Sequence, residues 1–405
     1  NTFTASGGNI TFTDAGFLKC ALSVSSIGTI STSNGTVVYD RQSGTQNVTQ
    51  GTYNNLTIDG NASHQIGGGV GINVLGNLVV NQNGSTVFDV RDKNITVSGT
   101  SDINGTLDIG SGTFDANGTF DATGGSVTFT DAGQLNLAGT VTSLGTFIRS
   151  TGTVEYDGAN QNVIALSSSS SSSYNNLIIS GTGTKTLEGT SKIYGDLTLT
   201  ASDFDINGKT IYLKENMNRT DGNLISGSSA NITIDNSGSH NICAFSDDDI
   251  TIKTTSTGGS VTTTGDISCK SIDLTSGSKT FLIDGETVNL DVDLVVTAGT
   301  FQMTSGVLNI NSNSSTSAVV EGGTLDLDGG TLTVGNSTEG DLSLTSGSID
   351  ISGGTLNIAD ELDVSNGTLR QSGGTINIKS YVGSGNGSSS AKFEMDAVTL
   401  TLTGG

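Results

Sequence analysis

The chain contains 405 residues, of which 16 are Lys or Arg and 39 are Asp or Glu, and its formal net charge is −23. Nucleic-acid binding needs a basic footprint, so this charge argues against a nucleic-acid partner and against attraction to anionic membranes. No apolar run approaches the ~18 residues that insertion across a bilayer requires. Glycine is frequent, with 58 residues, and proline is absent, which favours a chain whose backbone is paired almost throughout because proline cannot donate to a β-ladder.

The first half of the chain contains two copies of one long unit. Residues 7–16 return almost unchanged as residues 124–133, an offset of 117, and further matches follow in the same order. Self-similarity at a fixed offset is typical of stacked repeat architectures. We therefore expect two copies, over residues 7–100 and 124–213.

Differences between the copies indicate which side chains face inward. Val38 is replaced by Glu155, while the apolar residues on either side are kept, so position 38 is expected to face solvent. A one-residue slip would turn every inward side chain outward, so the register should be strongly fixed. The predicted core includes Ile10, Phe12, Val37, Tyr39, Leu56, Ile58, Phe129 and Tyr156.

The middle of the chain is the least regular part. Seven serines, residues 167–173, lengthen the second copy and are expected to form a flexible surface loop. Two further loops are expected, at 214–221 and 246–249. We place a boundary near residue 245, so that residues 1–245 hold the two repeats of about 117 residues and residues 246–405 hold regular turns of about 24 residues, in one continuous body.

The second half repeats a shorter phrase. Gly306-Val-Leu-Asn-Ile310 returns at Gly330, Gly354 and Gly374, in steps of 24, 24 and 20 residues. Within each step apolar and polar residues alternate, which is the period-two pattern of a strand with one buried face. About three such strands fit in each step. The predicted fold is therefore all-β, a single-stranded parallel β-helix (β-solenoid) of about 17 turns, each of roughly 20–27 residues with three short strands.

The three cysteines are Cys20, Cys243 and Cys269. The spacing of the last two is close to one turn, and equivalent positions in adjacent turns lie about 4.8 Å apart, within the range that a disulfide spans. The alternative is a pair of buried thiols stacked in the core, since free cysteine behaves as a small hydrophobic residue. Both alternatives stay open at this point, and Cys20 has no evident partner.

Residues able to carry chemistry are few. The two histidines, His64 and His240, lie in Ser-, Asn- and Gly-rich surroundings and are expected at the surface, which argues against a histidine-based triad or zinc site. Some parallel β-helices cleave polysaccharides with paired carboxylates. The candidates for such a pair are Asp247, Asp248, Asp249, Asp291, Asp293, Asp326 and Asp328.

These carboxylates do not predict an active site. Several of them occupy the polar phase of strands, and no Lys or Arg cluster accompanies them, so we expect no catalytic, cofactor-binding or metal-binding residues and no enzyme activity. Calcium binding is a less favoured alternative, because carboxylates project from neighbouring turns and Ca²⁺ accepts six to eight oxygen ligands. The EF-hand spacing and the Gly-Gly-x-Gly-x-Asp nonapeptide are both absent.

The order of short motifs in the first half resembles repeats in very large secreted surface proteins of Bacteroidota-type bacteria. More loosely, it is similar to the β-helical stems of filamentous-haemagglutinin-type adhesins. The resemblance covers residues 7–213 and implies export to the cell surface with an adhesive or structural role. The motifs that carry it are Gly152-Thr-Val-Glu-Tyr156, Gln161-Asn-Val163, Tyr174-Asn-Asn-Leu-Ile-Ile179, Gly181-Thr-Gly-Thr-Lys-Thr-Leu187 and Gly195-Asp-Leu197.

The ends of the sequence suggest how such a solenoid could assemble. The chain begins at Asn1 without Met or a signal peptide, which suggests a processed or excised segment, and strand pattern reaches close to both ends without a capping helix. Unpaired strand edges accept further strands, and head-to-tail contacts that do not close make filaments. We expect an extracellular structural protein, a subunit of a cell-surface filament or stalk that assembles with itself. The alternative is an adhesin stem that binds surface glycans or another cell; a polysaccharide-active enzyme is less favoured.

Overall fold

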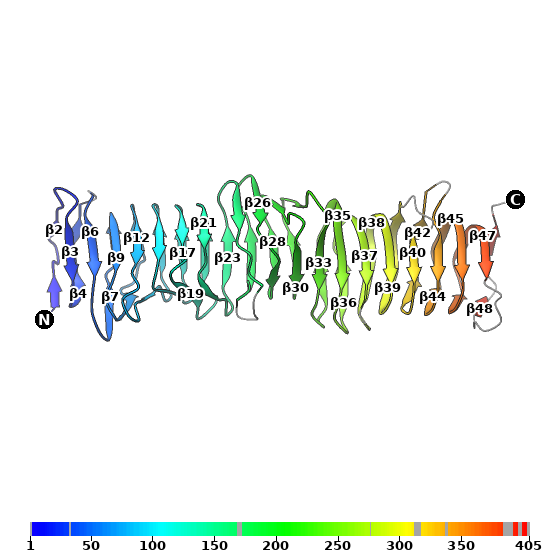
Figure 1. Ribbon diagram of the computed structural model, residues 1–405, viewed down its shortest axis with the longest axis horizontal. Helices are drawn as coiled ribbons and strands as arrows, with labels where there is room; N and C mark the ends of the chain where they lie inside the picture. The colour runs from blue at the N-terminus through cyan, green and yellow to red at the C-terminus, as the bar shows by residue number, and fades with distance from the viewer. Residues whose placement is uncertain are drawn as a thin grey trace. The chain divides into compact units, whose positions relative to one another are not determined.

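The computed structural model describes residues 2–31, 34–167, 172–275, 277–311, 317–336, 339–383, 392–395 and 399–402. Its chain forms two compact units, Asn1–Phe204 and Asp205–Gly405 (Figure 1). The described residues contain strands and turns, and none of them is helical. The strands are parallel and stack in about 18 turns. The predicted fold, a parallel β-solenoid, is therefore confirmed, whereas the boundary near residue 245 and the single continuous body remain predictions.

In the first unit, most strands belong to three parallel ladders. One ladder contains β3 (Phe17–Cys20), β6 (Thr36–Tyr39), β9 (Asn55–Ile58), β12 (Leu78–Val80), β15 (Ser101–Ile103), β18 (Phe120–Asp121) and β21 (Val141–Ser143). The second contains β7 (Thr45–Val48), β10 (Ser63–Ile66), β13 (Val87–Asp89), β16 (Thr106–Ile109), β19 (Ser126–Phe129) and β22 (Thr146–Ile148). The third includes β8 (Gly51–Tyr53), β11 (Ile72–Val74), β14 (Asn94–Val97), β17 (Thr113–Ala116), β20 (Gln134–Leu137), β23 (Thr153–Tyr156), β25 (Asn176–Ile179) and β28 (Leu197–Leu199).

Shorter pairings complete this part of the chain. The remaining strands are β1 (Thr2–Thr4) with β4 (Ser23–Ser26), β2 (Asn9–Ile10) with β5 (Thr29–Ile30), β24 (Gln161–Val163) with β26 (Thr184–Leu187), then β27 (Ser191–Ile193) and β29 (Asp203–Asp205).

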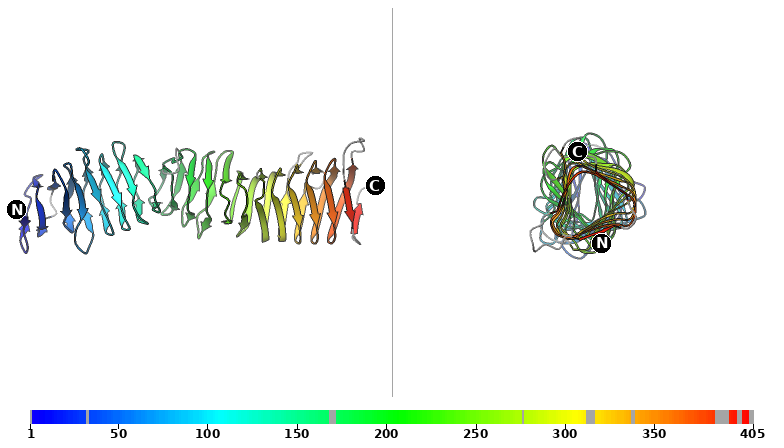
Figure 2. Two further views of the ribbon diagram at one scale, coloured as in Figure 1. Left: turned by 90° about the horizontal axis from the view of Figure 1, so that it is seen from below. Right: turned by 90° about the vertical axis from the view of Figure 1, so that its right-hand side faces the viewer.

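In the second unit, several strands are long because they continue around a corner of the coil. The longest, β38 (Thr280–Val296), has 17 residues and pairs along its length with different segments of its neighbours. Viewed along the stack, the turns of this unit superpose around a common core (Figure 2, right). The other strands are β30 (Thr210–Leu213), β31 (Met217–Arg219), β32 (Leu224–Ile225), β33 (Ala230–Ile234), β34 (His240–Ile242), β35 (Phe245–Thr254), β36 (Ser260–Thr263), β37 (Ile267–Leu274), β39 (Thr300–Ile310), β40 (Ala318–Val320), β41 (Thr324–Leu327), β42 (Thr331–Val334), β43 (Leu342–Leu344), β44 (Ser348–Ile351), β45 (Thr355–Val364), β46 (Thr368–Gln371), β47 (Thr375–Gly383), β48 (Lys392–Met395) and β49 (Thr399–Leu402).

The core consists of apolar columns, because in-register pairing places like side chains above one another. Leu325, Ile349 and Leu369 form one column through β41, β44 and β46. The rings of Phe281 and Phe301 stack at 5.4 Å between centroids and 6° between planes. Each fully buried aliphatic or aromatic side chain stabilises the coil by roughly 1.5–3 kcal/mol.

Most of the predicted core is confirmed. Two predicted core residues are less buried than expected, and one residue expected at the surface is buried. Ile10 and Phe12 are half-buried in the first turns. Val38, expected to face solvent, is only 5% exposed. It lies in register between Lys19 and Thr57, and side chains that share a face of adjacent turns cover a small residue between them. The other expected core residues are buried, namely Val37, Tyr39, Leu56, Ile58, Phe129 and Tyr156.

Two expected loops contain strands. Residues 246–249 lie inside β35, where the register shifts between Asp247 and Thr251, so the irregular sequence marks a bulge. Residues 214–221 contain β31. Serines 168–171 of the expected serine loop lie outside the described residues. No described segment forms a helix with the length and hydrophobicity needed to cross a membrane.

Glycines form a backbone column at one corner of the second unit. Gly330, Gly354 and Gly374 have φ angles of 75°, 67° and 67°, values that favour glycine. A Cβ on Gly354 would lie 2.6 Å from the carbonyl oxygen of Gly330. The repeated glycines of the sequence therefore allow successive turns to approach closely at this corner.

Candidate functional site

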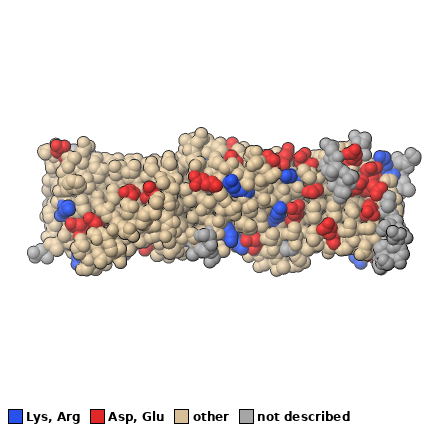
Figure 3. Space-filling view, viewed as in Figure 1, with Lys and Arg blue, Asp and Glu red and all other residues tan. Residues whose placement is uncertain are grey.

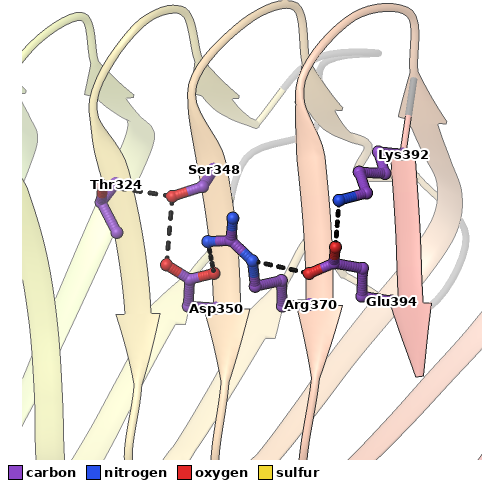
Figure 4. A network of polar contacts seen from close by, with 6 residues as sticks. All are labelled: Thr324, Ser348, Asp350, Arg370, Lys392 and Glu394. Carbon is purple, nitrogen blue, oxygen red and sulfur yellow. Dashed lines mark hydrogen bonds and ion pairs between the residues drawn. The ribbon is translucent and has the colours of Figure 1, made fainter. Parts of the chain in front are cut away.

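A ladder of polar side chains covers one outer face of the second unit (Figure 4). Asp350, Arg370 and Glu394 are in register on β44, β46 and β48. Arg370 Nη1 lies 3.2 Å from Asp350 Oδ1, and Arg370 Nε lies 2.9 Å from Glu394 Oε2. Lys392 contacts the same Glu394, and Lys392 and then Arg370 hold the pKa of Glu394 below its ordinary value. These charges are paired with one another at the surface, where an ion pair contributes about 0–1 kcal/mol.

The same face holds two of the carboxylates that the sequence singled out. The side-chain amide of Gln302 donates to Asp326 Oδ2 at 3.1 Å and to Asp328 Oδ2 at 2.9 Å. Burial raises the pKa of Asp326, and the neighbouring charges of Asp328 and Asp350 raise it further. The structure thus brings these carboxylates together within a hydrogen-bonded ladder on an exposed face.

The other candidate carboxylates have local structural contacts. Asp247 accepts the backbone N–H of Ser226 at 2.8 Å and that of Asp249 at 3.0 Å, and so holds the bulge of β35. Asp293 lies near Asp273, whose pKa is raised chiefly by burial. Asp248 and Asp291 are exposed. Within the described residues, no three His, Cys, Asp or Glu side chains are grouped so that they could hold a metal ion.

The three cysteines are free and buried, which settles the alternatives in favour of separate thiols. The in-register partner of Cys269 in the preceding turn is Asp247, so Cys243 is not at the equivalent position. Turn lengths vary, and the 26 residues between Cys243 and Cys269 do not equal one turn at this point of the coil. The register inferred from that spacing was therefore wrong. Burial raises the pKa of Cys20 and of Cys243 to about 11, which keeps both as unreactive thiols.

The expectation of surface histidines is wrong. His64 and His240 are 0% and 1% exposed. His64 lies in register between Gln46 and Phe88, in the inward column of its ladder. Neither ring nitrogen of His64 or His240 makes a hydrogen bond of standard geometry within the described residues. Burial lowers the pKa of both imidazoles, although backbone groups near both rings oppose the shift, so the neutral form is favoured.

Two buried lysines also point into the coil. Lys279 Nζ donates to the carbonyl oxygens of Asn236 at 2.6 Å, Gly238 at 2.7 Å and Gly258 at 3.2 Å. Lys185 Nζ makes three comparable bonds in the first unit, at 2.9 to 3.2 Å. Desolvation lowers the pKa of both amines. Each lysine thus ties together corner backbone from different turns.

In both repeat copies an inward glutamine also donates hydrogen bonds to backbone carbonyl groups at a corner. Gln46 Nε2 donates to the carbonyl oxygens of Cys20 and Leu22, each at 2.6 Å. In the second copy Gln161 Nε2 donates to Leu137 and Gly139, at 2.7 and 2.6 Å. The carbonyl groups lie 117 residues apart in the two copies, the offset read from the sequence. The same contact therefore occurs at corresponding positions of the two sequence copies.

A pair of tyrosines fixes a corner loop in each copy. In the second copy the hydroxyls of Tyr156 and Tyr174 lie 3.0 Å apart, Tyr156 accepts the N–H of Ile164 at 3.2 Å, and Tyr174 donates to the carbonyl of Ile164 at 2.7 Å. In the first copy Tyr39 and Tyr53 bind the N–H and C=O of Thr49 in the same way. Burial raises the pKa of Tyr156 to about 12, so these hydroxyls act as hydrogen-bonding groups.

Shallow grooves lie between successive corners of the coil. One groove of the first unit has a volume of about 450 Å³ and is called the four-turn groove below. It is lined by Gln82, Gly84, Ser85, Thr86, Val87, Asn104, Gly105, Thr106, Gly124, Gly125, Ser126 and Thr146, all of them uncharged. In contrast, acidic groups are spread over the face of the second unit seen in Figure 3.

Comparison with known proteins adds no relative. The chain matches no protein-family model, no curated protein and no solved structure at a significant level. Its assignment as a β-solenoid repeat protein therefore rests on its own strands and register.

Proposed function

We propose that this chain is a structural segment of an extracellular filament or stalk, and that copies associate end to end by β-strand addition. The single observation that supports the proposal most is the in-register stacking of parallel strands within each unit. Buried polar side chains such as Gln46, Lys185 and Lys279 bond corner backbone inside the coil. Such an arrangement suits a molecule that resists deformation.

The placement outside the cell rests on the resemblance of residues 7–213 to bacterial surface proteins. Immunolabelling of intact and permeabilised source cells tests it. Labelling of intact cells is the expected result, and labelling only after permeabilisation would contradict an extracellular role.

We propose that strand addition takes place at the first strands of the first unit. Among the described residues, β1, β2 and β3 pair on one side, with β4, β5 and β6. Phe3 and Phe17 on these edge strands are 39% and 70% exposed. An edge of this kind accepts a strand of another chain through main-chain hydrogen bonds, and exposed aromatic rings add apolar contact.

Sedimentation velocity over a concentration series tests this assembly. The average mass of the wild-type chain is expected to rise with concentration, and Phe17→Lys is expected to keep it low because an edge lysine opposes strand pairing. Val70→Lys is the matched control, since Val70 is 68% exposed and lies outside these strands. Equal behaviour of the two variants, or a wild-type chain that stays monomeric, would overturn the proposal.

A further inference from the structure

The four-turn groove crosses successive rungs of one ladder in the first unit. Its lining residues belong to β13, β16, β19 and β22 and to the corners that precede these strands. The strands pair consecutively, with Val87 beside Thr106, Thr106 beside Ser126, and Ser126 beside Thr146. Four rungs about 4.8 Å apart give the groove a length of roughly 14 Å.

The groove presents alcohol and amide groups held in defined positions. Asn104 Nδ2 donates to Asp102 Oδ1 at 2.8 Å, which orients the amide. The hydroxyls of Thr106 and Ser126 lie 3.0 Å apart across adjacent rungs. An amide oxygen has two lone pairs, and a hydroxyl group combines one donor with two acceptor lone pairs. The lining can therefore both donate and accept hydrogen bonds along its length.

Glycines allow the corners that line the groove to stack closely on one another. A Cβ on Gly124 would lie 2.7 Å from Asn104 Oδ1, and a Cβ on Gly125 would lie 2.3 Å from the carbonyl oxygen of Gly105. A side chain at Gly124 would thus displace the amide that faces the groove. Glycine in adjacent turns also lets a ligand approach the backbone closely.

We infer that the four-turn groove binds a short segment of a neutral polysaccharide. Each sugar hydroxyl donates one hydrogen bond and accepts others, as the lining alcohols and amides do. The formal charge of −23 repels polyanions, and no charged side chain lines the groove to attract a cation. The lining has no aromatic ring for stacking, so binding at one groove is weak and hydrogen bonds set its specificity. This binding goes beyond the proposed structural role and does not depend on assembly.

Affinity electrophoresis of the full chain tests the inference, with dextran, laminarin or xylan in the gel and polygalacturonate as the anionic comparison. We expect at least one neutral polysaccharide to retard the wild-type chain. The double variant Asn104→Ala/Ser126→Ala is expected to bind about tenfold more weakly, since it loses two groove-facing hydrogen-bonding groups. The matched control is Thr96→Ala/Thr113→Ala, on the outer face of β14 and β17 in the same unit, and it should retain wild-type retardation.

A second variant tests the groove independently, in case the first variant does not fold. Ser85 is exposed, so Ser85→Leu narrows the groove without entering the core, and weaker retardation is again expected. Circular dichroism confirms that each variant is folded. Absence of retardation by every neutral polysaccharide, equal retardation of groove and control variants, or retardation by polygalacturonate alone would overturn the inference. None of these results bears on end-to-end assembly, which sedimentation measures separately.

Discussion

Several side chains that face the core are polar, and their partners lie inside the coil. Lys279, Lys185 and the two inward glutamines satisfy carbonyl groups at corners, where the chain leaves one ladder and enters the next. Buried carbonyls without a partner are costly, so these side chains stabilise corners that the ladders leave incomplete. His64 and His240 differ, because their ring nitrogens make no hydrogen bond of standard geometry within the described part of the chain.

The inward positions of His64 and Lys185 were not predicted, because both are polar residues. The alternation of inward and outward residues along their strands does indicate these positions. His64 is two residues before the buried Ile66, and Lys185 is two residues before the buried Leu187. Period-two alternation therefore places both side chains inward. The two histidines were expected at the surface because their neighbours are mostly Ser, Asn and Gly, and burial of a charge is unfavourable. Neutralisation of the imidazole and carbonyl bonds to the ammonium group offset that cost.

Buried imidazoles predict a loss of stability in acid. Burial lowers the pKa of His64 below its ordinary value of about 6.5, and the backbone of Ala62 and Val87, followed by the charges of Asp59 and Asp40, opposes the shift. Below about pH 6.5 the unfolded chain therefore binds more protons than the folded chain, and the free energy of unfolding falls as the pH drops toward the folded-state pKa. Removing the imidazole with His64→Phe should reduce the decrease in melting temperature between about pH 7.5 and 5.5.

Thermal unfolding followed by circular dichroism at both pH values measures this effect. Gln65→Ala, on the outward side of the same strand, is the control and should keep the full wild-type pH dependence. An unchanged pH dependence in His64→Phe would show that the buried imidazole does not contribute to acid lability.

At the scale of the element, alternation and glycine spacing were sufficient to predict the repeated strands that follow Gly306, Gly330, Gly354 and Gly374, but not β31 or the start of β35, which lie in segments expected to be loops. The steps between Gly306, Gly330, Gly354 and Gly374 correspond to successive rungs of the paired strands. The 17-residue length of β38 could not be predicted in this way, because it depends on how a corner bends while its backbone stays paired. The four-turn groove likewise could not be predicted, because it depends on how the corners of successive turns lie relative to one another, and no local sequence pattern specifies this.

The glycine column makes a specific prediction for one corner. Gly354→Ala places a Cβ 2.6 Å from the carbonyl oxygen of Gly330 at a φ of 67°, and strain of this kind costs about 1–3 kcal/mol. Urea denaturation should show a decrease of this size in the free energy of unfolding. The control is Gly227→Ala, where no atom lies within 4 Å of the added Cβ, and its effect should stay within about 0.5 kcal/mol. Equal effects at both positions would contradict a steric requirement for glycine in the column.

At the scale of the whole molecule, charge and strand edges act in opposite directions. A formal charge of −23 keeps copies apart at low salt, whereas the strand edges that we propose as the assembly surface favour pairing. The Debye length falls from about 10 Å at 0.1 M to about 3 Å at 1 M ionic strength. Added salt should therefore strengthen end-to-end association, because it screens the repulsion and leaves main-chain hydrogen bonds in place.

Electron microscopy of the purified chain, over a series of protein and salt concentrations, tests the structural role most directly. The proposed role predicts unbranched fibres of constant width whose number and length grow with both concentrations. Discrete particles of single-chain size at every protein and salt concentration would contradict it.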